Sequence, residues 1–152
     1  MKDEKNLKIN IVRCTLIKEK CLKYQEAITS SELAASIFID YIGNRDREVF
    51  AVIGLDVGNK PTFLKIVSIG QLGEARVNMR ELFKPAILSN SASILIGHNH
   101  PGGTMKASVE DETITEKIRK VGSLLGISLL DHIIVSSEEA VSLREEKPDL
   151  FR

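Results

Sequence analysis

The pattern of apolar and polar positions first divides the chain into strand-like segments. Residues 9–17 (INIVRCTLI) have the β-branched content of a strand. Residues 49–57 (VFAVIGLDV) form a nearly continuous apolar run, and residues 62–70 (TFLKIVSIG) are expected to return as its hairpin partner after a turn near Asp56. Three more segments of strand type follow: residues 92–97 (ASILIG), residues 129–135 (LLDHIIV) and a short edge strand within residues 141–151.

Three other segments have the three- and four-residue apolar spacing of amphipathic helices. The first is expected to end at Gly43, and its cap is one of Thr29, Ser30 and Ser31. The second spans residues 78–89 and contains Pro85, which predicts a kink or a break there. The third follows Ser108 and ends near Gly126. Its predicted buried stripe consists of Ile114, Ile118, Val121 and Leu125.

Strands that alternate with helices indicate an α/β or α+β layered domain. The whole chain, residues 1–152, is expected to form one domain, because a chain of this length buries about two thirds of the surface that it exposes when unfolded. The composition, 43% hydrophobic and 28% charged residues, is that of a globular protein. Residues 1–8 and 148–152 are expected to be loosely ordered.

Charge and cysteine usage narrow the classes of function. Lysine plus arginine and aspartate plus glutamate each number 21, so the net charge is zero and no overall field steers the protein onto a phosphate backbone. Cys14 and Cys21 form no C-x-x-C pair, and we interpret them as reduced thiols. No apolar run is long enough for a membrane span, so we expect a cytoplasmic protein without a membrane partner. No pattern predicts an oligomeric state.

Two histidines follow the strand-like run 92–97. His98 and His100 are two residues apart, and side chains at this spacing in an extended chain point to the same side. Both imidazoles can therefore meet one metal ion. A pair of solvated histidines beside a Pro-Gly-Gly turn is the alternative. Two of only three histidines at this spacing on a strand end favour the metal site.

A catalytic zinc site needs three protein ligands and a water molecule, so a third donor is required. Asp111 is a candidate, because a helix capped by Ser108 carries it in its first turn, in line with the inward-facing stripe. Ser-x-x-Asp is also the signature of a capping box, which explains the pair without any metal. The two interpretations are compatible, since a capping hydroxyl keeps its proton and the helix dipole keeps the carboxylate ionised. The neighbouring Glu110 and Glu112 lie on other faces of this helix and are expected to be solvated or to complement the helix dipole, and not to bind the metal.

The spacing of the acidic residues in the sequence does not identify which glutamate is the general base. Glu32, Glu48, Glu74 and Glu81 are all available as candidates before the histidines. Glu48 stands at the mouth of the apolar run 49–57, where an ionisable group is costly unless it has a role. An ordinary charge at the end of a strand explains Glu48 equally well.

The third histidine, His132, lies within the strand-like run 129–135. Because Asp111 is available as the third donor, we interpret His132 as a core histidine or as a histidine that a neighbouring residue orients, and not as a ligand. Asp131 is expected to face the opposite side of the strand.

Several of these segments resemble a known family. GHNHPGG, followed by SVED with seven residues between His100 and Ser108, is similar to the H-x-H-P…S-x-x-D metal signature of the JAMM (MPN-plus) metalloproteases. DREVF, GHNHPGG, SVED, LLGISLLDHIIV and SLREE look like the RadC-type proteins, a bacterial branch of that superfamily. The resemblance runs from about Val12 to Glu146. The chain looks like the JAB/MPN core without the N-terminal helix-hairpin-helix segment of longer RadC proteins.

The resemblance implies a cytidine-deaminase-like JAB/MPN fold, in which helices flank a mixed curved β-sheet. It also implies one Zn²⁺ per chain and the roles of five residues: His98, His100 and Asp111 as zinc ligands, Ser108 as the oxyanion-stabilising serine and Glu48 as the glutamate of the early strand. This favours Glu48 over the other glutamates. Two departures concern the substrate pocket. GGTMKA stands where a Ser-Gly-Asp-Pro-Thr-Pro-like loop is common, and Asn78 stands where a histidine is often found.

Together these features predict a zinc metallopeptidase of JAMM type that hydrolyses peptide or isopeptide bonds of a peptide or protein substrate through a metal-activated water. A non-catalytic MPN-fold binding module is one alternative, and the complete ligand set argues against it. A DNA-repair-associated factor is another, and the charge balance does not support a nucleic-acid partner. A cupin-like H-x-H site does not fit, because a helix follows the histidines directly.

Overall fold

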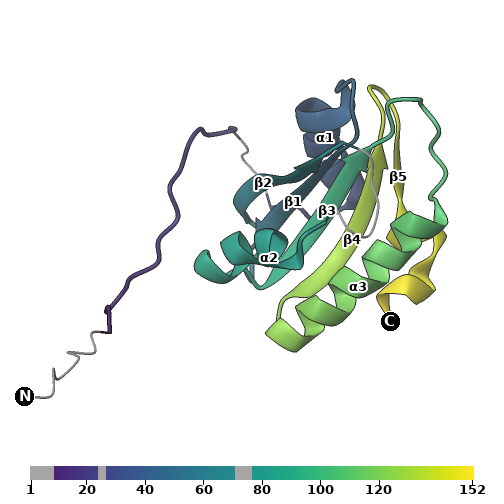
Figure 1. Ribbon diagram of the computed structural model, residues 1–152. Helices are drawn as coiled ribbons and strands as arrows, with labels where there is room; N and C mark the ends of the chain where they lie inside the picture. The colour runs from purple at the N-terminus through teal and green to yellow at the C-terminus, as the bar shows by residue number, and fades with distance from the viewer. Residues whose placement is uncertain (1–8, 24–26, 71–76) are drawn as a thin grey trace, which may run out of the picture.

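The computed structural model describes residues 9–23, 27–70 and 77–152. Along the chain the elements are α1 (Ser31–Phe38), a π-helical turn (Ile39–Gly43), β1 (Val49–Leu55), β2 (Pro61–Ile69), α2 (Met79–Leu88), β3 (Ser93–Asn99), α3 (Val109–Leu125), β4 (Ser128–Val135), β5 (Ala140–Ser142), α4 (Leu143–Glu146) and a 3₁₀ helix (Pro148–Phe151). Residues 9–23 belong to none of these elements and are drawn as an extended trace (Figure 1).

The strands form one mixed sheet in the order β2-β1-β3-β4-β5. β1 pairs antiparallel with both β2 and β3, β4 pairs antiparallel with β5, and β3 runs parallel to β4. α3 joins this parallel pair, because parallel neighbours need a crossover connection and cannot be closed by a tight turn. β3 therefore has a hydrogen-bonded strand on each side, and all of its residues from Ser93 to Asn99 are buried.

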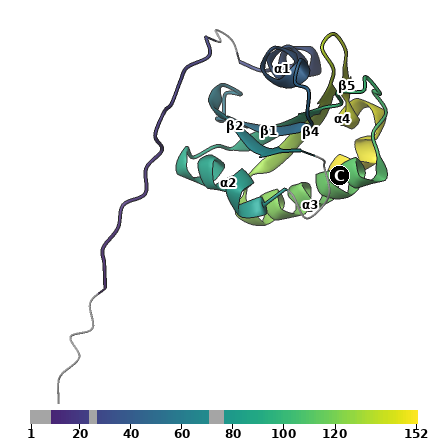
Figure 2. The ribbon, with the colours of Figure 1, turned by 45° about the horizontal axis from the view of Figure 1, so that its top comes forward.

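Helices cover both faces of this sheet, as Figure 2 shows. α1 packs on one face, where Phe38 belongs to a cluster with alternate residues of β1. α2 and α3 pack on the other face, through side chains such as Phe83 and Ile118. This arrangement confirms the predicted layered α/β domain with a mixed sheet flanked by helices. No helix within the described ranges has the length and apolar character that crossing a bilayer requires.

The predicted hairpin and helices are confirmed, and their local chemistry is visible. Ser30 is the cap of α1, since its side chain accepts a hydrogen bond from the N–H of Leu33. The expected break at Pro85 does not occur, and α2 continues to Leu88. Proline has no N–H for the carbonyl of Glu81 four residues earlier. Lys65 Nζ from β2 donates to that carbonyl instead, at 3.2 Å.

The prediction of a strand at residues 9–17 is wrong for the isolated chain. A strand is stable only when a neighbour satisfies its backbone N–H and C=O groups, and the described sheet offers these residues no ladder. Ile9, Ile11 and Ile17 are accordingly almost fully exposed. The β-branched composition alone therefore did not decide the conformation of this segment.

The C-terminal end also differs from expectation. Residues 148–151 form the 3₁₀ helix, and its Leu150 and Phe151 pack against buried side chains, so this end is not loosely ordered. Residues 1–8, which were expected to be loose, lie outside the described part of the chain. In α3 the predicted stripe is buried at Ile114 and Ile118, whereas Leu125 at the last turn is 45% exposed.

Close packing between α3 and the turn into β4 makes Gly122 a test of this fold. A Cβ atom on Gly122 would lie 2.3 Å from the main-chain oxygen of Ile127. Alanine normally stabilises a helix by about 1 kcal/mol relative to glycine, but we expect Gly122→Ala to lower the free energy of unfolding by about 1–3 kcal/mol, because backbone cannot move aside as a flexible side chain can. Urea denaturation measures the change.

The exposed neighbouring position gives the matched control. Ser123→Ala should change the free energy of unfolding by less than about 0.5 kcal/mol. If Gly122→Ala were as stable as the unmodified protein, the close approach of α3 to the β4 turn would be wrong.

Candidate metal centre

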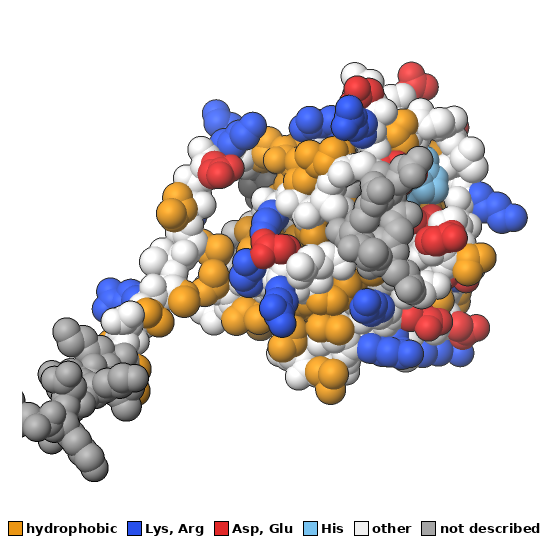
Figure 3. All heavy atoms as spheres, viewed as in Figure 1, with side chains coloured by type: hydrophobic (Ala, Val, Ile, Leu, Met, Phe, Trp, Pro, Cys, Tyr) orange, Lys and Arg blue, Asp and Glu red, His pale blue; other side chains and the backbone are white. Residues whose placement is uncertain are grey.

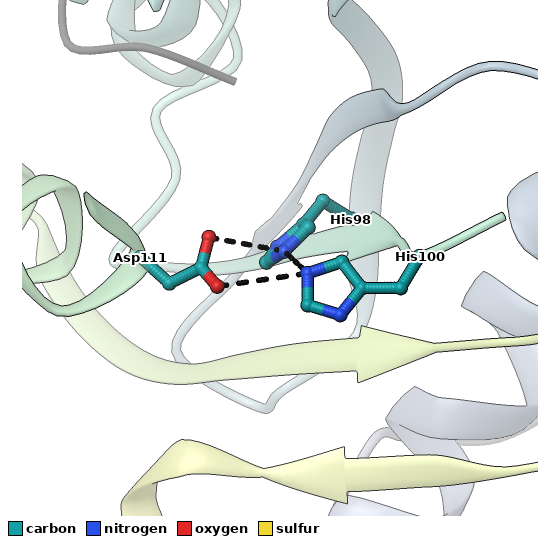
Figure 4. Close-up of side chains that lie close together, drawn as sticks. All are labelled: His98, His100 and Asp111. Atoms are coloured by element: carbon teal, nitrogen blue, oxygen red, sulfur yellow. Dashed lines mark hydrogen bonds and ion pairs between the residues drawn. The ribbon is translucent and has the colours of Figure 1, made fainter. Parts of the chain in front are cut away.

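Three predicted ligands come together where β3 ends and α3 begins (Figure 4). His98 Nε2 lies 2.8 Å from His100 Nε2 and 3.2 Å from Asp111 Oδ1, and His100 Nε2 lies 3.6 Å from Asp111 Oδ2. His98 and Asp111 are almost completely buried, while 14% of the His100 side chain is exposed. The site is therefore closed toward the core and open on one side.

The strand geometry explains why the two imidazoles share a side. His98 is the penultimate residue of β3, and His100 continues the extended chain, held by a hydrogen bond from its N–H to the oxygen of Val135 at 2.9 Å. Alternate residues of a strand point the same way. Phe50, the partner of His98 on β1, stacks on the His98 ring with 6.1 Å between the ring centroids.

Asp111 is placed by the cap of its own helix. Ser108 N–H donates to Asp111 Oδ2 at 2.8 Å, and Asp111 N–H donates to Ser108 Oγ at 3.1 Å, which completes a capping box. The same carboxylate faces both histidines. The capping and metal-site interpretations therefore hold together, because the cap orients the side chain toward the strand end.

The donor atoms at the centre fit a divalent metal ion. His100 Nδ1 lies 2.5 Å from the carbonyl oxygen of Thr104, and since a carbonyl cannot donate, Nδ1 carries the proton and the Nε2 lone pair of a neutral His100 faces His98 and Asp111. Zinc bonds of about 2.0–2.1 Å at tetrahedral angles set ligand atoms about 3.3 Å apart. The three separations, 2.8, 3.2 and 3.6 Å, lie around this value.

Electrostatics give two of the three candidate ligands, Asp111 and His98, the protonation states that a metal requires. Burial alone raises the pKa of Asp111, but its interactions with His100 and His98 outweigh this effect and hold the pKa well below its ordinary value. The carboxylate is therefore ionised. Burial lowers the pKa of His98, which favours its neutral ring. The hydrogen bond to Asp111 raises the pKa of the more exposed His100, so a protonated His100 has to release its Nε2 proton when a metal ion binds. Metal ligands must be an ionised carboxylate and neutral imidazoles.

Glu48 lies directly before β1 and is half-buried. Phe50 pairs with His98 in the antiparallel register of β1 and β3, and continuing this register by two residues sets Glu48 opposite His100. The negative charge of Glu48 also raises the pKa of both histidines, as a smaller effect than that of Asp111. The tertiary structure thus brings Glu48 to the centre, and its role as general base stays a prediction.

Asn99 is a site residue that the sequence interpretation missed. Its side chain is fully buried and points away from the metal centre, because it alternates with His98 and His100. Asn99 Oδ1 accepts the N–H of Val49 at 2.6 Å, and Asn99 Nδ2 donates to the oxygens of Arg45 and Arg47. These three bonds fasten the segment that carries Glu48. A polar residue inside an otherwise apolar strand was the available signal.

Two of the other candidate glutamates, Glu32 and Glu81, lie apart from the three candidate ligands. Glu32 is in the first turn of α1, on the opposite face of the sheet, and Glu81 pairs with Lys65 and Lys84. Glu74 lies outside the described residues. Of the neighbours of Asp111, Glu110 is exposed and Glu112 forms an ion pair with Lys147. Both lie in the first turn of α3, where a carboxylate complements the helix dipole, and neither belongs to the group of candidate ligands.

Three further residues named in the sequence analysis are also placed by the structure. Asn78 caps α2, where its Oδ1 accepts the N–H of Arg80 at 2.9 Å. His132 lies outside the group of three ligands and touches His98 from behind, so the interpretation of His132 as a non-ligand that contacts a neighbour agrees with the structure. Asp131 faces the other way, toward Ser142.

The open side of the centre leads to the molecular surface. Of the three histidines only His100 reaches solvent, and Figure 3 shows a histidine at the surface of the face drawn there. A polar pocket of about 250 Å³ adjoins His100 and is lined by Asn44, Arg45 and the turn 136–139. Acidic and basic side chains both occur across the face in Figure 3. Of the five predicted site residues, only His100 lines this pocket.

Comparison with known proteins identifies relatives over most of the chain. The sequence profile of the RadC-like JAB domain matches residues 28–148. UPF0758 proteins of Finegoldia magna and Clostridium beijerinckii are 39% and 40% identical over 119 and 126 residues, which is 78% and 83% of this chain. A UPF0758 protein of Methanosarcina acetivorans is 45% identical over 100 residues, or 66% of the chain.

These alignments cover 53%, 55% and 44% of the three relatives, so the chain spans about half the length of the curated relatives it matches. The matched range includes the positions of all five predicted site residues. It begins at residue 28, whereas the resemblance was expected to begin near Val12.

The three hydrogen bonds of the Asn99 side chain, called here the Asn99 clamp, predict how a substitution changes the free energy of unfolding. Asn99→Ala leaves the buried N–H of Val49 without its acceptor, and an unsatisfied buried group costs about 1–3 kcal/mol. We therefore expect the free energy of unfolding to fall by that amount, measured by urea denaturation. Asn44→Ala, at an exposed position in the same region, is the control and should change little. Equal stabilities of the two variants would contradict the clamp.

Proposed function

The chain belongs to the RadC-like JAB domain family, and from this membership and the geometry of the site we propose that it is a zinc-dependent hydrolase of peptide or isopeptide bonds. One observation carries the proposal. Two imidazole nitrogens and an ionised carboxylate converge at the end of a buried strand, beside a glutamate, and the group reaches solvent at His100. A purely structural role does not require acceptor atoms to face one another in this way.

Zinc is the metal that the donor set favours. Catalytic zinc sites use three protein ligands of the histidine and carboxylate type and leave a fourth position open. His98, His100 and Asp111 would hold the ion. When bound, zinc supplies Lewis acidity, which lowers the pKa of a water molecule toward about 7 and polarises a carbonyl group. Two histidines and one carboxylate also suit iron(II), so elemental analysis has to distinguish the two metals.

Two residues of the chain supply the remaining chemistry in this proposal. The carboxylate of Glu48 accepts a proton from the attacking water and later donates it to the leaving amine, which makes Glu48 first a base and then an acid. Ser108 Oγ accepts the N–H of Asp111, so its own proton is free to be donated to the carbonyl oxygen as negative charge develops there. Asn99 keeps the Glu48 segment in place during these transfers.

The metal part of the proposal is tested by elemental analysis. We expect about one equivalent of zinc per chain and a loss of most zinc in His98→Ala, His100→Ala and Asp111→Ala, while each variant stays folded by circular dichroism. Glu110→Ala is the matched control, because it removes a carboxylate from the same helical turn and should keep the zinc. Full zinc affinity in Asp111→Ala would leave Asp111 only its capping role. Bound iron in place of zinc would contradict the choice of metal.

The catalytic part is tested with Glu48→Gln. Glutamine keeps the size of the side chain but does not accept a proton at neutral pH. Zinc content should stay unchanged, and turnover should fall by roughly 10²–10⁴, the usual contribution of a positioned proton-transfer group. Cleavage of a peptide library and of ε-linked lysine isopeptides, followed by mass spectrometry, supplies the assay.

Glu32→Gln serves as the control for Glu48→Gln, since Glu32 lies on the other face of the sheet. Unchanged turnover in Glu48→Gln would exclude Glu48 as the base. A zinc-loaded protein that cleaves neither set of substrates would contradict the hydrolase and favour a non-catalytic binding module.

A further inference from the structure

A chain of buried hydrogen bonds runs from the back of His98 into α3. His98 Nδ1 lies 2.7 Å from His132 Nε2, and His132 Nδ1 lies 2.6 Å from Thr115 Oγ1. Thr115 Oγ1 in turn lies 2.5 Å from the main-chain oxygen of Asp111. His98, His132 and Thr115 are completely buried. The chain thus begins at one ligand and ends at the backbone of another.

The last contact sets the direction of all the others. A carbonyl oxygen has no proton to donate, so the hydroxyl proton of Thr115 must point at the oxygen of Asp111. Thr115 Oγ1 can then only accept from the imidazole beside it, which places a proton on His132 Nδ1. A neutral His132 with that proton has a lone pair on Nε2. Nε2 therefore accepts a hydrogen bond from His98 Nδ1–H.

The surroundings of His132 keep it neutral and in place. Burial lowers the pKa of His132 well below its ordinary value, and the positive charge of a protonated neighbouring histidine would lower it further. Phe50 lies edge-on to the His132 ring, with 5.6 Å between the centroids, and stacks on His98. This aromatic wall restricts rotation of both imidazoles, so the direction of the hydrogen bonds is maintained by packing as well.

We infer that Thr115 and His132 are positioning residues that select the Nδ1–H tautomer of His98 and thereby leave its Nε2 lone pair free for a metal ion. This inference rests on the proposed function only in taking His98 as a ligand. His100 is oriented separately, by the carbonyl of Thr104. The first turn of α3 thus contributes twice, through the Asp111 carboxylate as a ligand and through the Asp111 carbonyl as the fixed end of the chain.

The tautomers can be read directly in the metal-free protein. Long-range ¹⁵N–¹H correlation spectra of the imidazole rings distinguish a protonated from an unprotonated ring nitrogen. We expect the proton on Nδ1 in both His98 and His132. A proton on Nε2 of His132 would overturn the inference without the need for any variant, since the Thr115 hydroxyl would then point the other way.

Thr115→Val removes the hydroxyl and keeps the β-branched shape. His132 Nδ1–H then has no acceptor, and we expect His98 to shift toward its Nε2–H tautomer in the same spectra. Zinc affinity, measured by competition with a chelator, should fall by about 10- to 100-fold, the usual effect of losing a residue that orients a ligand. Thr115→Ser keeps the hydroxyl and should restore both the tautomer and the affinity.

The same helix offers a matched control. Thr113 Oγ1 donates to the main-chain oxygen of Val109 at 2.8 Å, which is the same i−4 contact on the exposed side of α3. Thr113→Val should change neither the His98 tautomer nor the zinc affinity. An unchanged tautomer and affinity in Thr115→Val would overturn the inference.

These measurements distinguish a failure of the proposed zinc hydrolase from a failure of the positioning role of Thr115 and His132. If the unmodified protein binds no zinc, the proposed function fails, and the spectra of the metal-free protein still decide how His98 and His132 are protonated. If zinc binds and Glu48→Gln behaves as expected but Thr115→Val matches the unmodified protein, only the positioning role of Thr115 and His132 fails.

Discussion

The carboxylate of Asp111 connects the start of α3 to the end of β3. One oxygen accepts the N–H of Ser108 and so completes the helix cap, and the other faces His98. Because the cap already fixes the orientation of this side chain, little rotational freedom is lost when it serves a metal ion. The position of the whole centre therefore depends on where α3 begins relative to the last residues of β3.

Because side chains alternate along the end of β3, residues 98–100 point to two different sides and have two different roles. His98 and His100 point toward α3, and Asn99 between them points to the backbone that precedes β1. One side of the strand end thus holds the candidate ligands, and the other side holds the segment that carries Glu48. Since β3 is hydrogen-bonded to a strand on each side, it can present both sets of side chains with little backbone motion.

Burial gives the polar groups at this site their directions. In water, the hydroxyl of Thr115 and the ring nitrogens of His132 would exchange partners freely, but in the core each donor must meet an acceptor. The carbonyl of Asp111 can only accept, so it determines the proton positions along the chain as far as His98. Capping, hydrogen bonding and the candidate metal site are consequently parts of one connected arrangement in the first turn of α3.

The sequence by itself determined the elements whose partners are close in the chain and the residues with a distinctive spacing. The 49–70 hairpin, the cap at Ser108 and the pair His98 and His100 depend on local periodicity and turn chemistry. The tertiary structure decided what depends on register between distant segments. It set Glu48 opposite His100, gave Asn99 and Thr115 their partners, and left residues 9–17 without a strand to pair with, because such contacts exist only once the sheet has formed.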